Sequence, residues 1–248
     1  MKFTVFGAGA IGAYLGGKLS LAGNEVTLVA RGPHLNAMQK NGLIIKEHGT
    51  ELLAQPEFCE TLDGNRNLGC LILGVKAYSL TEIAPLLGSK LDPETLIIPA
   101  QNGIPWWYFD SYGGSLEGTR LNSVDPGGVI SNHIPSGQIL GCVVFPAVEM
   151  VAPGIIQHIE GDRFSLGELD GSISDRLRLV SRTISSAGLR APVRSNIRQD
   201  IWVKLLGNLA FNPISALTKT SMEKISRDKT ILEIVRGMME EAVKVADS

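Results

Sequence analysis

A glycine-rich turn close to the N-terminus constrains this chain more than any other feature. Residues 2–6 read Lys-Phe-Thr-Val-Phe, a run that predicts a strand, and the turn Gly7-Ala8-Gly9-Ala10-Ile11-Gly12 follows at once. In such a turn the first glycine permits a tight reversal, the second lets the backbone approach a pyrophosphate, and the third lets the next helix pack closely on the strand. Phosphate oxygens would then meet N–H groups at the positive end of that helix. The motif alone is weakly specific, but its place between a strand and a helix predicts a dinucleotide site.

Strands and helices alternate after this turn. The apolar and turn patterns predict strands at 25–30, 70–75 and 96–99, and helices at 10–22, from Pro33 onward and at 78–87. Such alternation predicts an α/β fold with a doubly wound, Rossmann-type sheet. Residues 104–140 are rich in aromatic residues and turn pairs, which predicts an insertion of short turns instead of a regular crossover. Beyond this insertion we expect a helix at 172–187 and strands at 142–148, 155–159, 164–167 and 189–193.

The pattern becomes helical from about Ser195. We therefore predict a dinucleotide-binding domain over 1–194 and an all-helical domain over 195–248. About 50 residues are few for an independent core, so we expect the second domain to pack on the first, on a partner subunit, or on residues outside this sequence. The small helical domain favours a homodimer.

The end of the second strand indicates which dinucleotide is bound. NAD enzymes place an Asp or Glu there to hold the ribose 2′-hydroxyl, whereas this chain reads Leu28-Val29-Ala30-Arg31. The forked guanidinium of an arginine can instead bind a 2′-phosphate. The pattern favours NADPH over NADH, with an ordinary surface arginine as the alternative interpretation of Arg31.

Three polar residues recur at every fourth position of a predicted helix over 201–212, namely Lys204, Asn208 and Asn212. At 3.6 residues per turn they form one stripe with apolar flanks. A lysine and two amides in apolar company suit a cleft for a small polar ligand. There the lysine could deliver a proton to a carbonyl oxygen, and the amides could orient carboxylate and hydroxyl groups. A solvent-exposed stripe on an amphipathic helix is the alternative interpretation.

Composition and charge argue against several other classes of function. The formal net charge is −2, so the chain has no broad basic field for nucleic acid or an anionic membrane. It contains no uninterrupted apolar stretch of about 18 residues, and its apolar N-terminus lacks the features of a signal peptide. Cys59, Cys70 and Cys142 are widely spaced and fit neither a disulfide framework nor a metal site. We expect a soluble, cytoplasmic protein without a bound metal.

With these residues identified, the chain resembles the ketopantoate reductase (2-dehydropantoate 2-reductase) family almost from end to end. The resemblance rests on the order and spacing of five segments: the turn at 7–12, Arg31, Val75-Lys76-Ala77-Tyr78, Gln101-Asn102-Gly103, and Lys204-x3-Asn208-x3-Asn212-Pro213. It implies an enzyme that uses NADPH to reduce the C2 ketone of a 2-oxo acid to a 2-hydroxy acid. In this family the reaction converts ketopantoate to pantoate, on the route to pantothenate and coenzyme A.

The resemblance also implies roles for single residues. Arg31 and Lys76 would hold the adenosine 2′-phosphate, and Asn102 would lie at the ribose and nicotinamide end of the cofactor. Lys204 would be the general acid, and the two asparagines of its stripe would contact the substrate in a cleft between the two domains. The alternatives are a surface lysine after a strand for Lys76 and a turn residue beside a glycine for Asn102.

Three features depart from the family pattern. Members usually continue beyond the position of Ser248, with a Ser and a Glu that help to form the site, so we expect the helical domain to be incomplete in this sequence. Met222 stands where many members carry a further substrate-binding Asn. The aromatic segment 104–109 is not general in the family. It would either cover the nicotinamide and reshape the substrate pocket, or form a buried patch or a subunit contact.

These departures leave two other functions open. A related β-hydroxyacid or polyol dehydrogenase would share the two-domain plan and the helical lysine and asparagine, and Met222 keeps this alternative open. A non-catalytic NADP-binding or redox-sensing protein is the other alternative, which an incomplete helical domain would favour. Lys204 and Asn208 argue against that second alternative, because a protein that only binds the cofactor needs neither.

Overall fold

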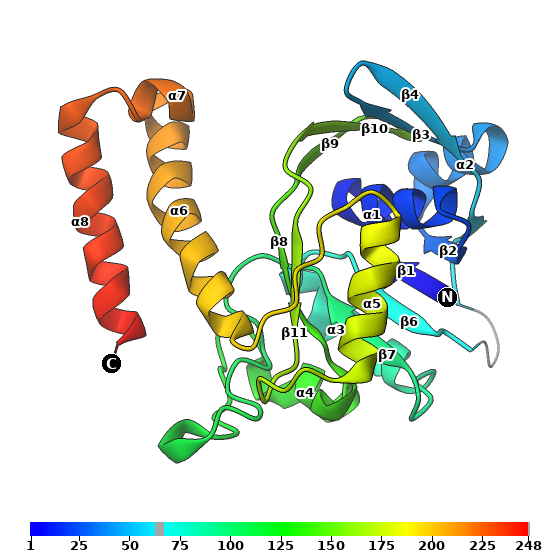
Figure 1. Ribbon diagram of the computed structural model, residues 1–248, viewed down its shortest axis with the longest axis horizontal. Helices are drawn as coiled ribbons and strands as arrows, with labels where there is room; N and C mark the ends of the chain where they lie inside the picture. The colour runs from blue at the N-terminus through cyan, green and yellow to red at the C-terminus, as the bar shows by residue number, and fades with distance from the viewer. Residues whose placement is uncertain (63–66, 248) are drawn as a thin grey trace. The chain divides into compact units, whose positions relative to one another are not determined.

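The computed structural model describes residues 1–62 and 67–247 (Figure 1). The chain divides into two compact units, Met1–Ile197 and Arg198–Ser248, and each is described by itself. The division lies slightly beyond the boundary at 194–195 that the sequence pattern suggests.

A parallel sheet forms the centre of the first unit. Its strands, in spatial order, are β5 (Glu57–Cys59), β2 (Glu25–Val29), β1 (Lys2–Phe6), β6 (Cys70–Leu73) and β7 (Leu96–Pro99). Three helices lie between these strands in sequence: α1 (Ala10–Leu21), α2 (Gly32–Asn41) and α3 (Leu80–Gly88), the last preceded by the short turn η1 (Ala77–Ser79). Because the order runs outward from β1 in both directions, the Rossmann-type doubly wound sheet expected from the sequence is confirmed.

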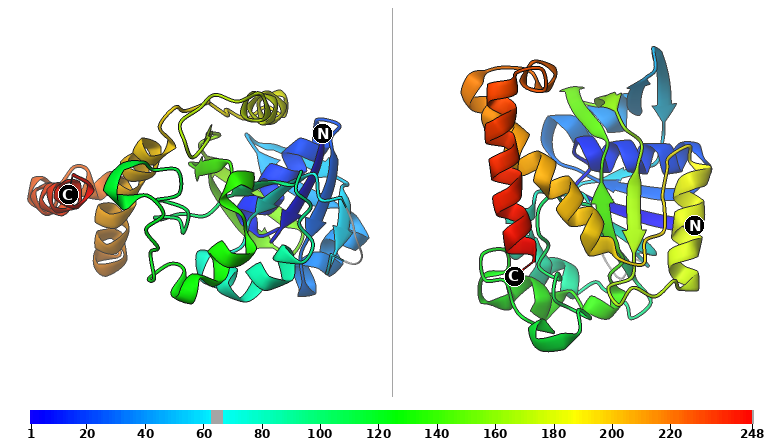
Figure 2. Two further views of the ribbon diagram at one scale, coloured as in Figure 1. Left: turned by 90° about the horizontal axis from the view of Figure 1, so that it is seen from below. Right: turned by 60° about the vertical axis from the view of Figure 1, so that its left-hand side comes forward.

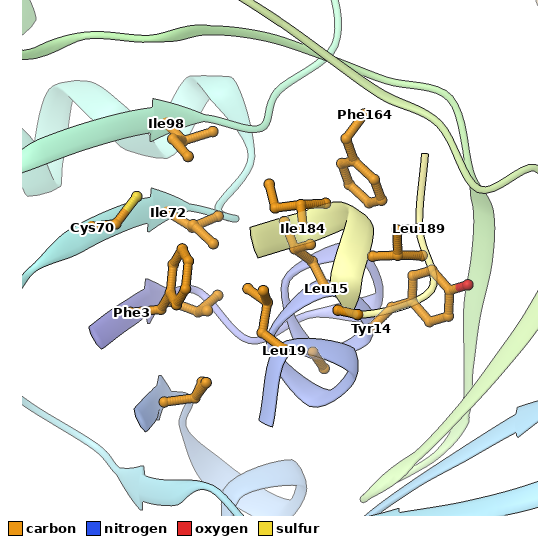
Figure 3. Packing of buried hydrophobic residues seen from close by; sticks show 14 of the residues in the cluster. Phe3, Tyr14, Leu15, Leu19, Cys70, Ile72, Ile98, Phe164, Ile184 and Leu189 are labelled. Carbon is orange, nitrogen blue, oxygen red and sulfur yellow. The ribbon is translucent and has the colours of Figure 1, made fainter. Parts of the chain in front are cut away.

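Helix α1 is packed between two sheets. Two adjacent glycines make this possible: a Cβ on Gly16 would collide with Leu28 of the parallel sheet, and a Cβ on Gly17 would lie 2.6 Å from Cδ1 of Ile45 in a second sheet. Leu15, on the same helix, joins a buried cluster that includes Phe3 of the parallel sheet (Figure 3). Such close approach of strands on both sides positions α1, and with it the glycine turn that precedes it.

The second sheet includes strands that were not expected from the sequence. Its order is β4 (Thr50–Ala54), β3 (Leu43–Glu47), β10 (Ile155–Glu160) and β9 (Ala147–Ala152). The strand expected at 155–159 is β10, and it pairs in parallel with β3. The single strand expected at 142–148 is wrong, because β8 (Gly141–Val144) ends before Pro146 and β9 begins after it. Proline has no N–H to donate to a ladder, so it separates the two strands.

The first unit also contains an antiparallel pair, β8 with β11 (Phe164–Gly167). The insertion at 104–140 consists of short turns, as expected, with η2 (Gly114–Leu116), η3 (Pro126–Gly128), α4 (Val129–His133) and η4 (Ser136–Gln138). The predicted helix at 172–187 is α5 (Asp175–Ser186), whose first turn is capped by Ser174. The last strand expected at 189–193 is wrong, since Arg190 and Val193 form only isolated bridges on either side of Pro192.

The second unit is helical, as the sequence predicts. Its elements are α6 (Ile197–Thr218), α7 (Met222–Ile225) and α8 (Lys229–Ala246). Ala210 and Ile214 of α6 pack with Val235 of α8 in a small apolar core, and the two helices run side by side (Figure 1 and Figure 2). Pro213 lies inside α6, and the helix continues past it although this residue has no N–H to donate to the preceding turn.

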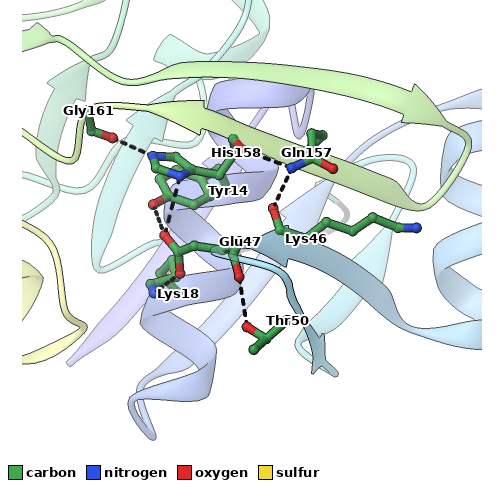
Figure 4. Close-up of polar contacts among 8 residues, drawn as sticks. All are labelled: Tyr14, Lys18, Lys46, Glu47, Thr50, Gln157, His158 and Gly161. Atoms are coloured by element: carbon green, nitrogen blue, oxygen red, sulfur yellow. Dashed lines mark hydrogen bonds and ion pairs between the residues drawn. The ribbon is translucent and has the colours of Figure 1, made fainter.

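A buried polar cluster joins α1 to the second sheet (Figure 4). Glu47 of β3 accepts hydrogen bonds from the hydroxyl of Tyr14 at 2.6 Å and from the ammonium of Lys18 at 2.7 Å. The ring of His158, from β10, stacks on Tyr14 with centroids 5.1 Å apart. Burial raises the pKa of the Glu47 carboxyl, but the hydrogen bonds from Lys18 and Tyr14 and the charge of Lys18 lower it more. This pKa therefore lies below its ordinary value.

Removing this carboxylate should destabilise the first unit strongly. We expect Glu47→Ala to lower the free energy of unfolding at pH 7 by about 3–5 kcal/mol, because the buried ammonium of Lys18 loses its counter-charge. The matched control is Glu51→Ala on β4, whose ion pair with Lys46 is exposed and should contribute less than about 1 kcal/mol. Urea unfolding measures both differences.

The loss of stability caused by Glu47→Ala should also depend on pH. Because the folded pKa of Glu47 is lowered, its stabilisation is complete above the unfolded pKa of 4.5 and is lost as the pH falls through the folded value. The difference in stability between wild type and Glu47→Ala should therefore narrow on acidification from pH 5 to pH 3. A difference that widens over this interval would contradict the assignment.

Candidate active site

The glycine turn between β1 and α1 is shaped by contacts within the chain. Gly7 has φ of +96°, a conformation that favours glycine, and the N–H groups of Gly7 and Ala8 donate to the carbonyl of Val29 at 3.1 and 2.8 Å. A Cβ on Gly12 would collide with the carbonyl oxygen of Gly7, whereas a Cβ on Gly9 would meet nothing within 4 Å. The first and third glycines are therefore required by the fold, and the second faces open space.

The N-terminus of α1 offers a site for an anion. Gly9 is the N-cap residue, and no side chain in the described part of the molecule caps the helix there. Ala10 and Ile11 are the first helical residues, and the first four N–H groups of an α-helix have no partner within the helix. These N–H groups and the open face of Gly9 fit a pyrophosphate. Because the N–H of Ala8 already donates to the backbone, this residue could contribute shape but not that donor.

The other predicted cofactor residues follow neighbouring strands of the same sheet. Arg31 comes after β2 as the N-cap of α2, Lys76 comes after β6, and Asn102 comes after β7. All three are exposed. Since carboxyl ends of parallel strands meet at one edge of a sheet, the fold brings these segments to the edge that carries the glycine turn. Strands β2 and β6 flank β1, so Arg31 and Lys76 approach that turn from opposite sides.

Gly74 and Val75, which follow β6, pack directly against the glycine turn. A Cβ on Gly7 would lie 2.5 Å from Cγ1 of Val75, and a Cβ on Gly74 would lie 2.5 Å from the carbonyl oxygen of Gly7. The N–H of Gly74 also donates to the carbonyl of Phe6 at 2.9 Å. The backbone that leads into Lys76 is thus held at van der Waals distance from the turn.

The lysine and asparagines of the polar stripe lie in the second unit. Helix α6 is continuous through Lys204, Asn208 and Asn212, so the fourfold spacing places them on one face. The structure therefore groups the predicted site residues into two sets, the cofactor residues at the sheet edge of the first unit and the stripe on α6.

Family models match both units. The model described as ketopantoate reductase PanE/ApbA matches residues 3–105, and the C-terminal model of the same family matches residues 196–248. The chain belongs to the ketopantoate reductase family. It is therefore an oxidoreductase, and the alternative of a non-catalytic binding protein is set aside.

Curated relatives agree with this family assignment. The chain is 49% identical over 253 residues to a 2-dehydropantoate 2-reductase from Mesorhizobium japonicum, and the match covers 100% of the chain and 76% of that relative. A 2-dehydropantoate 2-reductase from Pyrococcus horikoshii is 29% identical over 99% of the chain and 73% of its own length. The chain thus spans about three quarters of the length of these ketopantoate reductases.

Solved structures share the fold of this chain. A Ralstonia solanacearum protein described as a ketopantoate reductase superposes with a TM-score of 0.89 and 38% identity, over 97% of this chain and 75% of that one. A D-mandelate dehydrogenase solved with NADH and anilino(oxo)acetate superposes with a TM-score of 0.84 over 100% of this chain and 74% of that one. At 22% identity this second likeness concerns the fold alone.

Two of the departures from the ketopantoate reductase pattern, the aromatic segment and Met222, occupy different environments. Trp107 of the aromatic segment is buried, with its ring against Gly141, where a Cβ would lie 2.9 Å from the indole. Tyr108 packs edge-on against Phe109, with ring centroids 4.9 Å apart. Burial favours a packing role for Trp107. Met222, by contrast, is the first residue of α7 and is exposed.

Two residues near the cofactor edge were not assigned roles from the sequence. His34 of α2 accepts a hydrogen bond at Nδ1 from the N–H of Gly154 at 2.9 Å, and burial lowers the pKa of its imidazole. A neutral imidazole can accept at Nδ1, so this contact ties α2 to the β9–β10 turn at neutral pH. The side-chain amide of Gln101 donates to the carbonyls of Leu73 and Val75, at and just beyond the C-terminal end of β6. Both contacts join residues far apart in sequence, so no local pattern announces them.

Three side chains of the kind that ligate metals gather at the second sheet. Glu47, His48 and His158 could each offer one ligand atom, all within 4.8 Å of one another. Both oxygens of Glu47 already accept hydrogen bonds, and the charge of Lys18 beside them opposes a cation. We interpret the group as structural. In the described part of the chain, no helix combines the length and apolar character needed to cross a bilayer.

Proposed function

We propose that this ketopantoate reductase homologue uses NADPH to reduce a 2-oxo acid to a 2-hydroxy acid, with ketopantoate as its substrate. The observation that carries the proposal is the 49% identity to a 2-dehydropantoate 2-reductase over the whole chain. The glycine turn supports it, because its second glycine and the uncapped start of α1 fit a dinucleotide pyrophosphate.

The chain's own residues would divide the work between binding and proton transfer. The turn from Gly7 to Gly12 would hold the pyrophosphate, and Asn102 would bind the ribose next to the nicotinamide. When bound, the reduced nicotinamide supplies a hydride to C2 of the oxo acid. Lys204 would donate a proton from Nζ to the carbonyl oxygen, which becomes the hydroxyl of the product. Asn208 and Asn212 would bind the substrate's polar groups from the same face of α6.

The selection of NADPH would rest on Arg31 and Lys76. Both are exposed cations at the sheet edge that carries the turn, and the strand preceding Arg31 ends without the acidic residue that an NAD site uses. A hydrogen bond to a charged group contributes about 1.5–3 kcal/mol. We therefore expect Arg31→Ala to raise the Kd of NADPH about tenfold or more and to leave that of NADH within about twofold.

Fluorescence titration with each cofactor measures this selectivity. Lys40→Ala is the matched control, because Lys40 is an exposed cation in the last turn of the same helix, away from the sheet edge. If Arg31→Ala weakens the binding of NADPH and NADH equally, Arg31 does not bind the 2′-phosphate.

The substrate is tested by turnover. Initial rates of NADPH oxidation should be highest with ketopantoate within a panel of branched, linear and aromatic 2-oxo acids. A second candidate, another hydroxyacid dehydrogenase, is favoured by Met222 and by the aromatic segment that follows Asn102. Turnover on other 2-oxo acids without turnover on ketopantoate would favour the second candidate. The proposed reduction of a 2-oxo acid by NADPH would still hold. Absence of turnover on the whole panel, in a protein that binds NADPH, would refute the proposed reaction.

A further inference from the structure

Gln101 connects the ends of two neighbouring strands. It follows β7 by two residues, and its side-chain Nε2 donates to the carbonyl of Leu73 at 2.6 Å and to that of Val75 at 3.2 Å. The main chain makes the preceding contact, from the N–H of Ala100 to the carbonyl of Leu73 at 3.0 Å. In a parallel ladder the next acceptor lies two residues further along, which is Val75. The side-chain amide therefore extends the pairing of β6 and β7 beyond the end of the strands.

The segment that Gln101 holds leads directly into Lys76. On its other side, Gly74 and Val75 pack against Gly7 of the glycine turn. The segment is thus clamped between the turn and the amide of Gln101. Because Lys76 is exposed and directly precedes the turn η1 as its N-cap residue, the direction of its side chain depends on the peptide that Gln101 fixes.

Only the donor end of the Gln101 amide has partners among the described residues. The Oε1 atom of Gln101 is buried, and no residue in the described ranges donates to it. Both hydrogen bonds of the amide are made to the backbone that precedes a proposed cofactor residue, Lys76.

We propose that Gln101 is a positioning residue for cofactor selection. By holding the carbonyl of Val75 it aims Lys76 at the 2′-phosphate of NADPH, without itself touching that phosphate. The inference rests on the proposed binding of NADPH by Lys76. It deepens that proposal by naming the residue through which the sheet edge sets the preference between NADPH and NADH.

The test compares cofactor affinities in Gln101→Met, which keeps the length of the side chain and removes both donors. The Kd of NADPH should rise about fivefold to tenfold, whereas the Kd of NADH should stay within about twofold, because NADH has no phosphate for Lys76 to reach. In Lys76→Ala the preference for NADPH over NADH should fall by a similar factor, and the remaining preference should come from Arg31. Adding Gln101→Met to Lys76→Ala should then cause no further change in the ratio of the two Kd values.

The chain offers a closely matched control in Gln138. Its Nε2 also donates to two backbone carbonyls, those of Asp92 at 2.6 Å and Pro93 at 3.0 Å, and its Oε1 is likewise buried without a donor among the described residues. These contacts lie before β7, at the opposite end of that strand. Gln138→Met should therefore leave both Kd values within about twofold. If Gln101→Met does not fold, Gln101→Asn, which is one methylene shorter, should show the same selective loss.

The possible results distinguish the positioning role of Gln101 from the proposed binding of NADPH by Lys76. If Lys76→Ala lowers the preference for NADPH but Gln101→Met weakens both cofactors equally, or neither, the positioning role is refuted and the cofactor assignment stands. If Lys76→Ala leaves the ratio of the Kd values unchanged, the proposed role of Lys76 is wrong, and the inference falls with it. Only a selective loss in Gln101→Met that disappears in the Lys76→Ala background supports the inference.

Discussion

Replacing Lys204 by alanine should lower kcat for 2-oxo acid reduction by about 100-fold or more, while the Kd of NADPH stays within about twofold. Proton transfer by a positioned side chain typically contributes about 10²–10⁴-fold to a rate, and alanine has no proton to give. The affinity for NADPH should be preserved because the proposed cofactor residues lie in the first unit, whereas Lys204 lies in the second. Steady-state rates and a cofactor titration on the same preparation measure both quantities.

A matched control separates loss of the proton donor from a general loss of charge. Lys224 lies on α7 in the same unit and is exposed, so Lys224→Ala should keep kcat within about twofold. Lys204→Arg keeps the positive charge but holds its proton much more tightly, and it should therefore remain slow. A Lys204→Ala variant that retains most of its kcat would show that the proton comes from elsewhere.

Local patterns were sufficient to predict the first strand, the turn and the helix α1. Gly7 is required by its positive φ, and Gly12 by a collision with a residue only five positions away. Such constraints act within one short segment, so the sequence reveals them. The polar stripe of Lys204 was predictable for the same reason, because a helix converts a fourfold spacing into a single face.

The second sheet could not be predicted in this way. In β3, buried and half-buried residues alternate, which is a strand pattern, but its parallel partner β10 begins with Ile155, more than a hundred residues later in the sequence. A period of two shows that a segment is a strand without showing which sheet it joins. The buried pair of Glu47 and Lys18 depends on that sheet, so it could not be foreseen either.

Long-range contacts also limited the prediction of the site. The partners of Gln101 lie 28 and 26 residues before it, and the partner of His34 lies 120 residues after it. The motif Gln101-Asn102-Gly103 predicted a role for its asparagine, whereas the contacts of the glutamine with β6 became known only from the structure. A motif identifies a segment, but only the fold shows which distant side chains hydrogen-bond to its backbone.

Alanine at Gly12 and alanine at Gly9 should both weaken NADPH binding, but only the first should destabilise the fold. In Gly12→Ala the new methyl group meets the carbonyl oxygen of Gly7 and, at 3.0 Å, Cγ1 of Val5. Neither the turn nor the central strand can move cheaply, so we expect a loss of about 1–3 kcal/mol in stability. In a domain of this size, each kcal/mol of lost stability lowers the Tm by about 2–4 °C. The affinity for NADPH should fall more than tenfold, because relieving the collision opens the turn.

Gly9→Ala should instead leave the folded protein almost unchanged. Gly9 has a φ of −73°, which any residue adopts, and its Cβ would meet no atom within 4 Å, so Tm should stay within about 2 °C of wild type. The Kd of NADPH should nevertheless rise about tenfold or more, since a methyl group would stand where the backbone must approach the pyrophosphate. A stable Gly9→Ala protein with unaltered affinity would show that the pyrophosphate does not lie over this residue. A stable protein with selectively weakened binding would identify the open face of the turn as the place where the cofactor lies.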